Sequence, residues 1–558
     1  MARSVPLSLT LAVAVALAGS SMKGLAKSPD ISLTPLASIP ASTPGSGAAE
    51  IVAYDPTTQR LFVVNNLLTA PGEPKLDVFN VANPALPSLL GTVDLSDFGQ
   101  AANSVAVRGG IIAVAVEASP KTAPGAVVFL APDLSLLKVV EVGSQPDMIT
   151  FTHSGRFVLT ANEGEPSTYP AGSPPFGNTL ANDPEGSVSI IDISKGVAAA
   201  TVRNVRFNAV ALPAGVRIYG PGATQAQDIE PEYIATSHDS RTAWVTLQEN
   251  NGLAVIDIPS ATLTRVVSLG LKDHGLADNG FGSSNAFDAS DRDPTPEDAA
   301  QVPPKLSSID IKTHPRVHGL YEADAIASYS VGPTTYLVMA NEGDARTDWP
   351  NYNEEILVGA PAYVLDPTAF PDAAALKANA SLGRLRVSKA SGDTDGDGDY
   401  DKIISFGGRS FSIRTTDGTL VWDSGDVIEK QIAARYPAYF NVSNNNNTFE
   451  NRSPSKGPEP EGVAIGKVSG RTYAFVGLER IGGVMTFDIS DPKAPVVVDY
   501  VNTRDLPAVP PTAATGDLGP EGIIFVTGDD SPTGKPLVVS ANEISGTTVI
   551  YEVAPSGK

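Results

Sequence analysis

The chain has 558 residues, no cysteine and a formal net charge of −23 at pH 7. Without cysteine it can form neither disulfides nor thiolate metal sites, and its acidity argues against nucleic acid or an anionic membrane as a partner. A chain of this length exceeds one ordinary hydrophobic core unless it is built from repeats.

The N-terminal segment has the features of a secretory signal peptide, with Arg3 followed by an apolar run from Val5 to Ala18 and then small residues. We therefore predict a signal peptide over residues 1–26, a linker over 27–45 and a secreted protein, either extracellular or periplasmic. No later stretch approaches the roughly 20 apolar residues of a membrane span. The C-terminal residues contain no surface-anchor motif, so we expect release or periplasmic residence rather than covalent attachment.

Short β-branched runs bounded by turn residues recur along the chain and predict an all-β fold. A two-part signature organises these runs. Its first part is a turn that opens a strand and often contains Pro or an acid; it begins at Ala49, Asn103, Pro146, Glu230, Glu322, Glu459 and Pro520. Its second part ends the next strand and usually contains Glu; it begins at Asn65, Glu117, Asn162, Gln248, Asn341, Leu478 and Asn542.

Seven such pairs predict a single seven-bladed β-propeller over residues 46–555, in which the innermost strand of every blade lines one channel. A third marker, an apolar run that ends in Asp, as in Val188–Asp192, is expected to complete a blade. Long insertions are predicted at about 165–187, 270–318 and 345–455, and long loops on a rigid scaffold often carry binding sites. Two packed β-sandwiches are the alternative fold, which would leave the paired signature unexplained.

The acids of the two signatures are the main candidate site. Carboxylates that face one narrow axis repel one another unless they are paired, protonated or bound to metal. Calcium, which takes 6–8 oxygen ligands, answers that repulsion directly, although another divalent metal is possible. The alternative is that these acids accept backbone hydrogen bonds and staple the blades together. They are Asp147, Glu163, Glu232, Glu249, Asp324, Glu342, Glu461, Glu479, Glu521 and Glu543.

The segment from Asp393 to Asp401 resembles a calcium-binding loop. Asp393, Asp395 and Asp397 occupy alternate positions and Gly398 the sixth place, but the twelfth place is Ile404, where a Glu is expected. We predict a structural calcium site here, with a solvated acidic turn as the alternative.

Several basic residues lie close to the acids in sequence. Arg offers a bidentate fork to phosphate or carboxylate, so Arg346 and Arg480 are candidates to clamp an anionic ligand, and Arg409 and Lys456 to bind it. Salt bridges between blades are the alternative use for them. The five histidines show no zinc spacing, and no P-loop, nucleophile elbow or zincin motif is present.

Many motifs, taken together and in order, resemble one known family. They include 227-QDIEPEYIATS, 322-EADAIASY, 340-ANEGDART, 452-RSPSKGPEPEG and 541-ANEISGTT. The chain from roughly Glu50 onward is similar to the choice-of-anchor I propellers, which include mesenchyme-specific cell-surface glycoproteins and bacterial proteins described as atypical alkaline phosphatases. The resemblance implies a β-propeller and allows a phosphatase activity.

Two functional hypotheses follow. The first is a secreted, metal-dependent phosphoester hydrolase of the atypical alkaline phosphatase type, acting on a small phosphorylated substrate. The second is a non-catalytic module that binds calcium and recognises a mineral or cell-surface component; another hydrolase activity, such as that of a lactonase, is a weaker third. The sequence leaves the oligomeric state open. In the first hypothesis the catalytic residues are Glu461, Glu479, Arg480 and Arg346, and the metal ligands are Glu163, Glu249, Glu342, Asp324 and Glu543.

Overall fold

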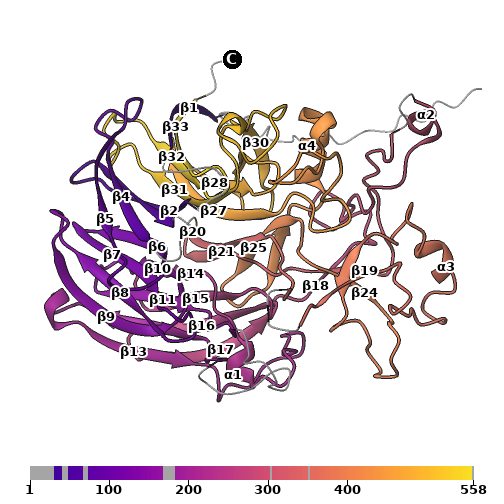
Figure 1. The fold of residues 1–558 in the computed structure, drawn as a ribbon, viewed down its shortest axis with the longest axis horizontal. Helices are drawn as coiled ribbons and strands as arrows, with labels where there is room; N and C mark the ends of the chain where they lie inside the picture. Colours follow the sequence, from indigo (N-terminus) through magenta and orange to yellow (C-terminus); the bar gives the residue numbers. More distant parts are fainter. Residues whose placement is uncertain are drawn as a thin grey trace, which may run out of the picture.

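The computed structural model describes residues 31–40, 48–66, 73–167, 182–301, 305–347, 349 and 352–555. Within them, seven four-stranded antiparallel sheets are arranged as blades around one axis, and an eighth sheet of five strands lies beside the ring (Figure 1). The predicted all-β, seven-bladed propeller is therefore confirmed. The predicted signal peptide lies outside the described residues.

The first four blades follow the chain in order. The first contains β2 (Ala48–Asp55), β3 (Arg60–Asn66), β4 (Pro74–Asn80) and β5 (Ser88–Asp94). The second contains β6 (Ala101–Arg108), β7 (Ile111–Glu117), β8 (Pro124–Leu130) and β9 (Leu136–Ser144). The third contains β10 (Pro146–Phe151), β11 (Phe157–Asn162), β12 (Ser187–Asp192) and β13 (Thr201–Arg206). The fourth contains β14 (Ile234–Thr236), β15 (Thr242–Leu247), β16 (Gly252–Asp257) and β17 (Thr262–Ser268).

The last three blades are interrupted or closed by distant segments. The fifth contains β20 (Ile326–Val331), β21 (Thr334–Asn341), β25 (Ser410–Thr415) and β26 (Leu420–Asp423). The sixth contains β27 (Pro460–Val468), β28 (Arg471–Leu478), β29 (Val484–Asp488) and β30 (Val496–Val501). The seventh contains β31 (Pro520–Val526), β32 (Leu537–Asn542), β33 (Thr547–Pro555) and β1 (Ile31–Pro40).

Helices are short and lie between strands. The α-helices are α1 (Gln225–Asp228), α2 (Pro296–Ala299), α3 (Ala373–Leu376) and α4 (Val427–Arg435), and the 3-10 helices are η1 (Val197–Ala199), η2 (Pro437–Tyr439) and η3 (Ala513–Thr515).

Burial explains why the blades form. The second and third strands of a blade are covered on both faces by neighbouring blades, so they are continuous apolar runs, as in the Ile-Ile-Ala-Val-Ala-Val of β7. The outermost strands face solvent, and β5 is largely exposed. The strands that end in Asp, such as β12, are third strands, and a fourth follows each of them. The expectation that this marker completes a blade is therefore wrong.

The ring is closed by the N-terminal strand. β1 pairs antiparallel with β33, from Ile31 opposite Pro555 to Pro40 opposite Thr547. Part of the predicted linker over residues 27–45 is thus a blade strand. The alternation of buried Ile31 and Leu33 with polar Ser32 and Thr34 is the signal for that strand.

The fifth blade carries the eighth sheet at its side. This sheet joins β18 (Leu271–Asp273) and β19 (Val317–Leu320), which precede the blade, to β22 (Glu355–Leu357), β23 (Arg386–Ser388) and β24 (Ile403–Ser405), which interrupt it. β19 and β24 pair in parallel. The predicted insertion over 345–455 is therefore wrong in one respect, because it includes blade strands β25 and β26.

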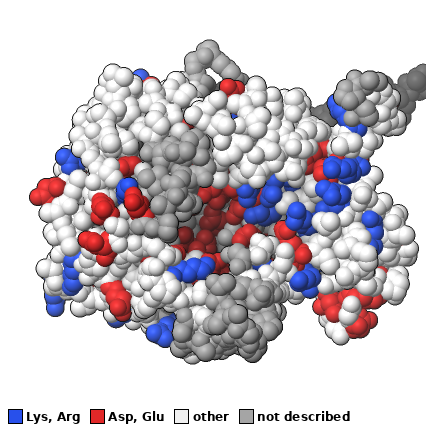
Figure 2. All heavy atoms as spheres, viewed as in Figure 1, with Lys and Arg blue, Asp and Glu red and all other residues white. Residues whose placement is uncertain are grey.

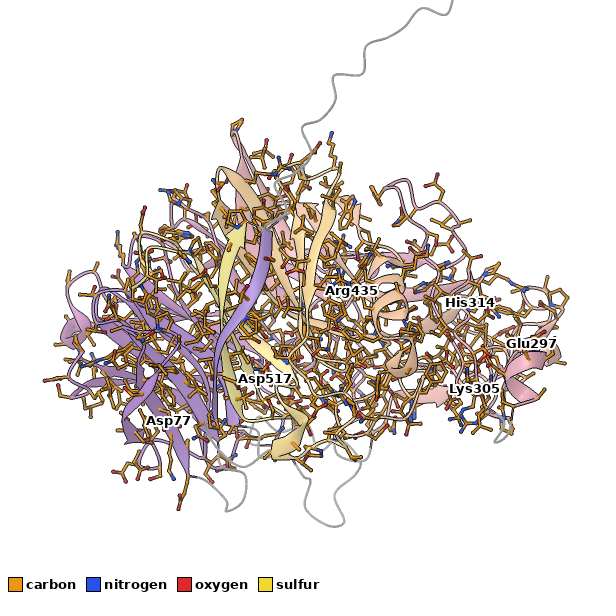
Figure 3. All side chains as sticks on the ribbon, turned by 90° about the horizontal axis from the view of Figure 1, so that it is seen from above. Asp77, Glu297, Lys305, His314, Arg435 and Asp517 are labelled. Atoms are coloured by element: carbon orange, nitrogen blue, oxygen red, sulfur yellow. The ribbon has the colours of Figure 1, made fainter. Side chains whose placement is uncertain are left out.

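Figure 3 shows where the segment between β18 and β19, within the predicted insertion over 270–318, lies relative to the first blade. In Figure 3, Asp77 of β4 lies near one end of the molecule, and Glu297 and Lys305 lie at the other. This segment therefore lies at the end of the molecule opposite the first blade.

Shortening a buried side chain in β1 tests the closure. Leu33 is 4% exposed and packs with Tyr551 and Val553. Leu33→Ala is expected to lower the free energy of unfolding by about 2–5 kcal/mol, measured by denaturant unfolding. Leu89→Ala on the exposed edge of β5 is the control, expected within about 0.5 kcal/mol of the original chain. Equal effects of the two changes would contradict the closure.

Candidate functional site

Residues from every blade meet in one cavity on the propeller axis. The cavity measures about 100 Å³, enough for several water-sized ligands. The innermost segments of the blades contribute to its lining Ile51, Asn103, Asp147, Glu232, Asp324, Glu461 and Glu521. Figure 2 shows the result from outside, as Asp and Glu side chains that fill a central hollow with Lys and Arg at its edge. We call these carboxylates the axial acids.

Backbone irregularities aim the axial acids at the channel. The register of the innermost strand shifts across Asp147 in β10, Glu461 in β27 and Glu521 in β31. Such bulges insert an extra residue and redirect a side chain. Pro precedes each of these three acids in the sequence. The turn signature of the sequence therefore corresponds to the same backbone irregularity in three blades.

Glycine lets neighbouring innermost strands approach closely. A Cβ at Gly462 would lie 1.9 Å from the carbonyl oxygen of Glu521, and one at Gly522 would lie 2.9 Å from that of Glu50. Any larger residue would push the strands apart. Glycine directly after the acid thus keeps the channel narrow and its carboxylates close together.

A second tier of acids follows the second strands of the blades. Oxygen atoms of Asp147, Glu163 and Glu232 lie within 4.8 Å of one another, and so do those of Asp324, Glu342 and Glu461. We call these sets the first and second carboxylate groups. Glu342 also joins a third group with Glu459 and Glu479. Among the predicted metal ligands, the structure therefore brings Glu163, Glu342 and Asp324 into oxygen-rich groups.

The first two groups have little counter-charge. Among the described residues, no Lys or Arg forms an ion pair with Asp147, Glu163, Glu232, Asp324 or Glu461, whereas Glu342 pairs with Lys456. The amide of Gln145 donates to Glu163, and that of Gln248 donates to Glu342 at 2.8 Å. Within the described ranges, buried carboxylate oxygens of Glu249, Glu461 and Glu479 have no hydrogen-bond partner.

Burial and mutual repulsion raise the pKa of these carboxyls. The pKa of Asp147 rises to about 7, and those of Glu249 and Glu479 rise to about 8. The pKa values of Glu163, Glu232, Asp324, Glu461, Glu521 and Glu543 are raised as well, with burial as the largest cause. The metal-free channel therefore holds protons that ordinary carboxyls release.

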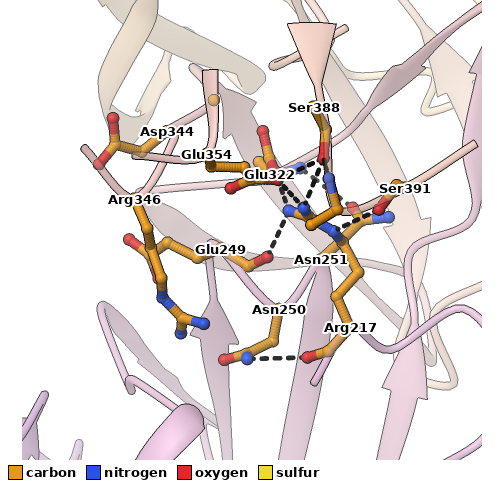
Figure 4. A network of polar contacts seen from close by, with 12 residues as sticks. Arg217, Glu249, Asn250, Asn251, Glu322, Asp344, Arg346, Glu354, Ser388 and Ser391 are labelled. Atoms are coloured by element: carbon orange, nitrogen blue, oxygen red, sulfur yellow. Dashed lines mark hydrogen bonds and ion pairs between the residues drawn. The ribbon is translucent and has the colours of Figure 1, made fainter. Parts of the chain in front are cut away.

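A different set of acids is fully paired. Glu230, two residues before Glu232, accepts from Arg346 at 2.8 Å and from the indole of Trp349 at 3.0 Å. Glu322, two residues before Asp324, accepts from Arg217 at 2.9 Å (Figure 4). In each turn the first acid is thus a staple between segments and the second is left free to face the axis.

The turn before Glu461 follows the same rule. Glu459 is fully buried and pairs with Arg452, with Arg480 at 2.7 Å and with Lys456 at 3.2 Å. Burial would raise the pKa of Glu459, but these three cations hold it well below its usual range. Sequence reasoning placed Glu459 in the turn without seeing that role, and it missed Arg217.

The basic residues predicted to hold an anion do not meet in one place. Arg346 is 1% exposed and is used by Asp228 and Glu230. Arg409 is 3% exposed and donates to Glu429 and to the carbonyl of Ser453. These two arginines therefore hold the fold together. Arg480, whose side chain is 20% exposed, pairs with Glu459 at 2.7 Å and with Glu479 at 2.8 Å, so it lies in the third group.

The predicted calcium loop lies apart from the channel, between β23 and β24 of the insertion. Asp393, Asp395 and Asp401 offer oxygens within 4.8 Å of one another, and Asp397 lies outside that set. The loop is exposed and is held by its own hydrogen bonds, with Asp393 accepting from the backbone N–H of Gly396 at 2.7 Å.

The predicted ligand Glu543 lies near Glu521 in the channel, and its charge raises the pKa of Glu521.

Comparison with known proteins fits this architecture. The model of the choice-of-anchor I domain matches residues 50–492. The chain belongs to the choice-of-anchor I family.

This choice-of-anchor I chain has curated relatives in marine animals. It is 32% identical over 187 residues to Gigasin-3a of Magallana gigas, covering 31% of this chain and 66% of that protein. It is 28% identical over 340 residues to a mesenchyme-specific cell surface glycoprotein of Strongylocentrotus purpuratus, covering 54% of this chain and 40% of that protein. The chain thus spans only part of the length of these relatives.

Solved structures resemble the choice-of-anchor I chain loosely. The hydrazine synthase of Kuenenia stuttgartiensis has a TM-score of 0.44 at 12% identity and 93% coverage of this chain, with 98% of that chain covered. The WD40 domain of Toxoplasma gondii coronin has a TM-score of 0.46 at 8% identity and 95% coverage, with 88% of that chain covered.

Two glutamates of one turn should behave in opposite ways in the choice-of-anchor I chain. In chelator, Glu230→Gln is expected to cost about 3 kcal/mol of unfolding free energy, since it breaks a buried ion pair. Glu232→Gln removes a carboxylate that has no counter-charge, so it should leave the stability unchanged or raise it. Denaturant unfolding measures both. A loss with Glu232→Gln as large as that with Glu230→Gln would contradict this division.

The raised pKa values predict how the metal-free domain responds to pH. Between the ordinary carboxyl pKa near 4.5 and about 8, the folded channel binds more protons than the unfolded chain. The free energy of unfolding in chelator should therefore fall as pH rises from 5 to 8. Denaturant midpoints at several pH values test this, and a rise over that window would refute it.

Proposed function

We propose that this chain is an extracellular or surface propeller module that binds calcium on its axis. Family membership and the printed name of the sea urchin relative, a cell surface glycoprotein, support the location. No helix among the described residues is long and apolar enough to cross a membrane. One observation carries the binding role: two carboxylate groups converge from different blades with almost no counter-charge from the chain.

The donor set favours calcium over other metals. All the donors of the first and second carboxylate groups are carboxylate oxygens, which hard cations prefer. Neither group contains Cys or His, which are the ligands that zinc favours. Calcium also accepts irregular geometry with 6–8 ligands, whereas magnesium demands a near-ideal octahedron. Acids contributed by separate blades are more easily arranged in the irregular geometry of calcium than in the regular octahedron of magnesium. We propose one ion at each of the two groups.

Binding can be measured directly. The purified chain is expected to gain thermal stability with calcium and less with magnesium, following ligand mass action. Glu461→Gln removes a ligand of the second group and should weaken calcium affinity at least about 10-fold in calorimetric titration. Glu73→Gln, at an exposed acid outside the channel, is the matched control and should bind as the original chain does.

Two results would overturn the proposal. Calcium that leaves the melting temperature and the titration heat unchanged would exclude an axial site. Equal binding by Glu461→Gln and the original chain would place calcium elsewhere, for instance in the loop of Asp393 and Asp395.

A second candidate function is a metal-dependent phosphoester hydrolase. It is favoured by Arg480, which is partly exposed and pairs with Glu479 beside the second group, where an anion bound to a cation would meet it. Assaying a phosphomonoester with calcium, with zinc and with chelator tests this candidate. Metal-dependent turnover that Glu461→Gln abolishes would support it, and no turnover in any condition would leave the binding module.

A further inference from the structure

The ammonium group of Lys456 lies among oxygens at the edge of the second carboxylate group. Its Nζ is 2.7 Å from Glu342 Oε1, 3.2 Å from Glu459 Oε2 and 3.6 Å from Asp344 Oδ1. It also donates to the carbonyl of Gly343. Lys456 itself is 8% exposed. Three carboxylates and one carbonyl thus surround a single positive charge.

This surrounding resembles the coordination of a metal ion. Carboxylate and backbone carbonyl oxygens are the ligands that calcium takes in proteins. The carboxylate oxygens of Glu342, Glu459 and Glu479 come within 4.8 Å of one another. Glu479 is 5% exposed, and its Oε2 has no partner among the described residues. The ammonium group of Lys456 therefore lies where a metal ion would find oxygen ligands.

The backbone before β27 fixes Lys456 in this position. The turn is closed by hydrogen bonds from the amides of Ser455 and Gly457 to the carbonyl of Arg452, at 2.9 and 3.1 Å. Gly457 follows Lys456 with a φ of 68°, which favours glycine. The lysine thus enters the channel edge from a rigid turn.

We propose that Lys456 occupies a third cation site of the channel and so limits the number of divalent ions that the channel binds. This inference rests on the proposed calcium binding. The tethered ammonium supplies the charge that a metal supplies at the other two groups. Removing it takes the paired cation from Glu342 and one of the three cations from Glu459, and it frees the oxygens of Glu342, Asp344 and Glu459 that now face the ammonium group.

Lys456→Met is the direct test, with Lys467→Met, at an exposed lysine of β27, as the control. In chelator, Lys456→Met should melt several degrees below the original chain, because three acids lose their shared cation. In millimolar calcium the difference should shrink or vanish. Calorimetric titration should show one more calcium ion per chain than in the original protein, and Lys467→Met should show no change.

Lys456→Gln, which keeps a donor for Glu342 and Gly343, provides the same test should the Met variant not fold. Lys456→Arg keeps the positive charge and should keep the original stoichiometry. An unchanged number of calcium ions in both neutral variants, or a stability loss that calcium does not reduce, would overturn the inference. If the original chain binds calcium and Glu461→Gln weakens that binding, the proposed function survives this result.

Discussion

Repulsion among carboxylates on the propeller axis is the constraint on which the other features of this molecule depend. Seven blades bring their innermost strands to one line, and five of them place an acid in the axial cavity: Asp147, Glu232, Asp324, Glu461 and Glu521. Bulges turn the side chains inward, and Gly462 and Gly522 keep the strands close. A structure that gathers like charges in this way requires protons or cations to hold it together.

The chain answers the repulsion differently on its two acid sets. Glu230 and Glu322 each pair with a buried Arg from a distant segment, and Glu459 pairs with the partly exposed Arg480, so all three act as staples. Their neighbours two residues later receive none among the described residues. Buried ion pairs are costly to break but contribute little net stability. We therefore read the paired acids as devices that fix the position of the free ones, which are left for a ligand.

The sequence predicts those features of the propeller and its site that leave a local pattern, and it does not predict contacts between distant segments. The repeated turn and acid predict both the blade number and the gathering at Asp147, Glu342 and Glu461, because equivalent positions of a propeller share one axis. The partner of Glu230 is Arg346, 116 positions away, and no local pattern announces such a pair. Strand β25 carries no acid marker, so the sequence alone places it inside the insertion predicted over 345–455. Likewise, β1 precedes the first repeat and is separated from β33 by nearly the whole chain.

The most direct test of axial binding is an anomalous scattering experiment on crystals of the chain grown with calcium and then exchanged with a lanthanide. The account predicts strong peaks between Asp324, Glu342 and Glu461 and between Asp147, Glu163 and Glu232. Peaks confined to the exposed loop of Asp393 and Asp395, with none on the axis, would contradict it.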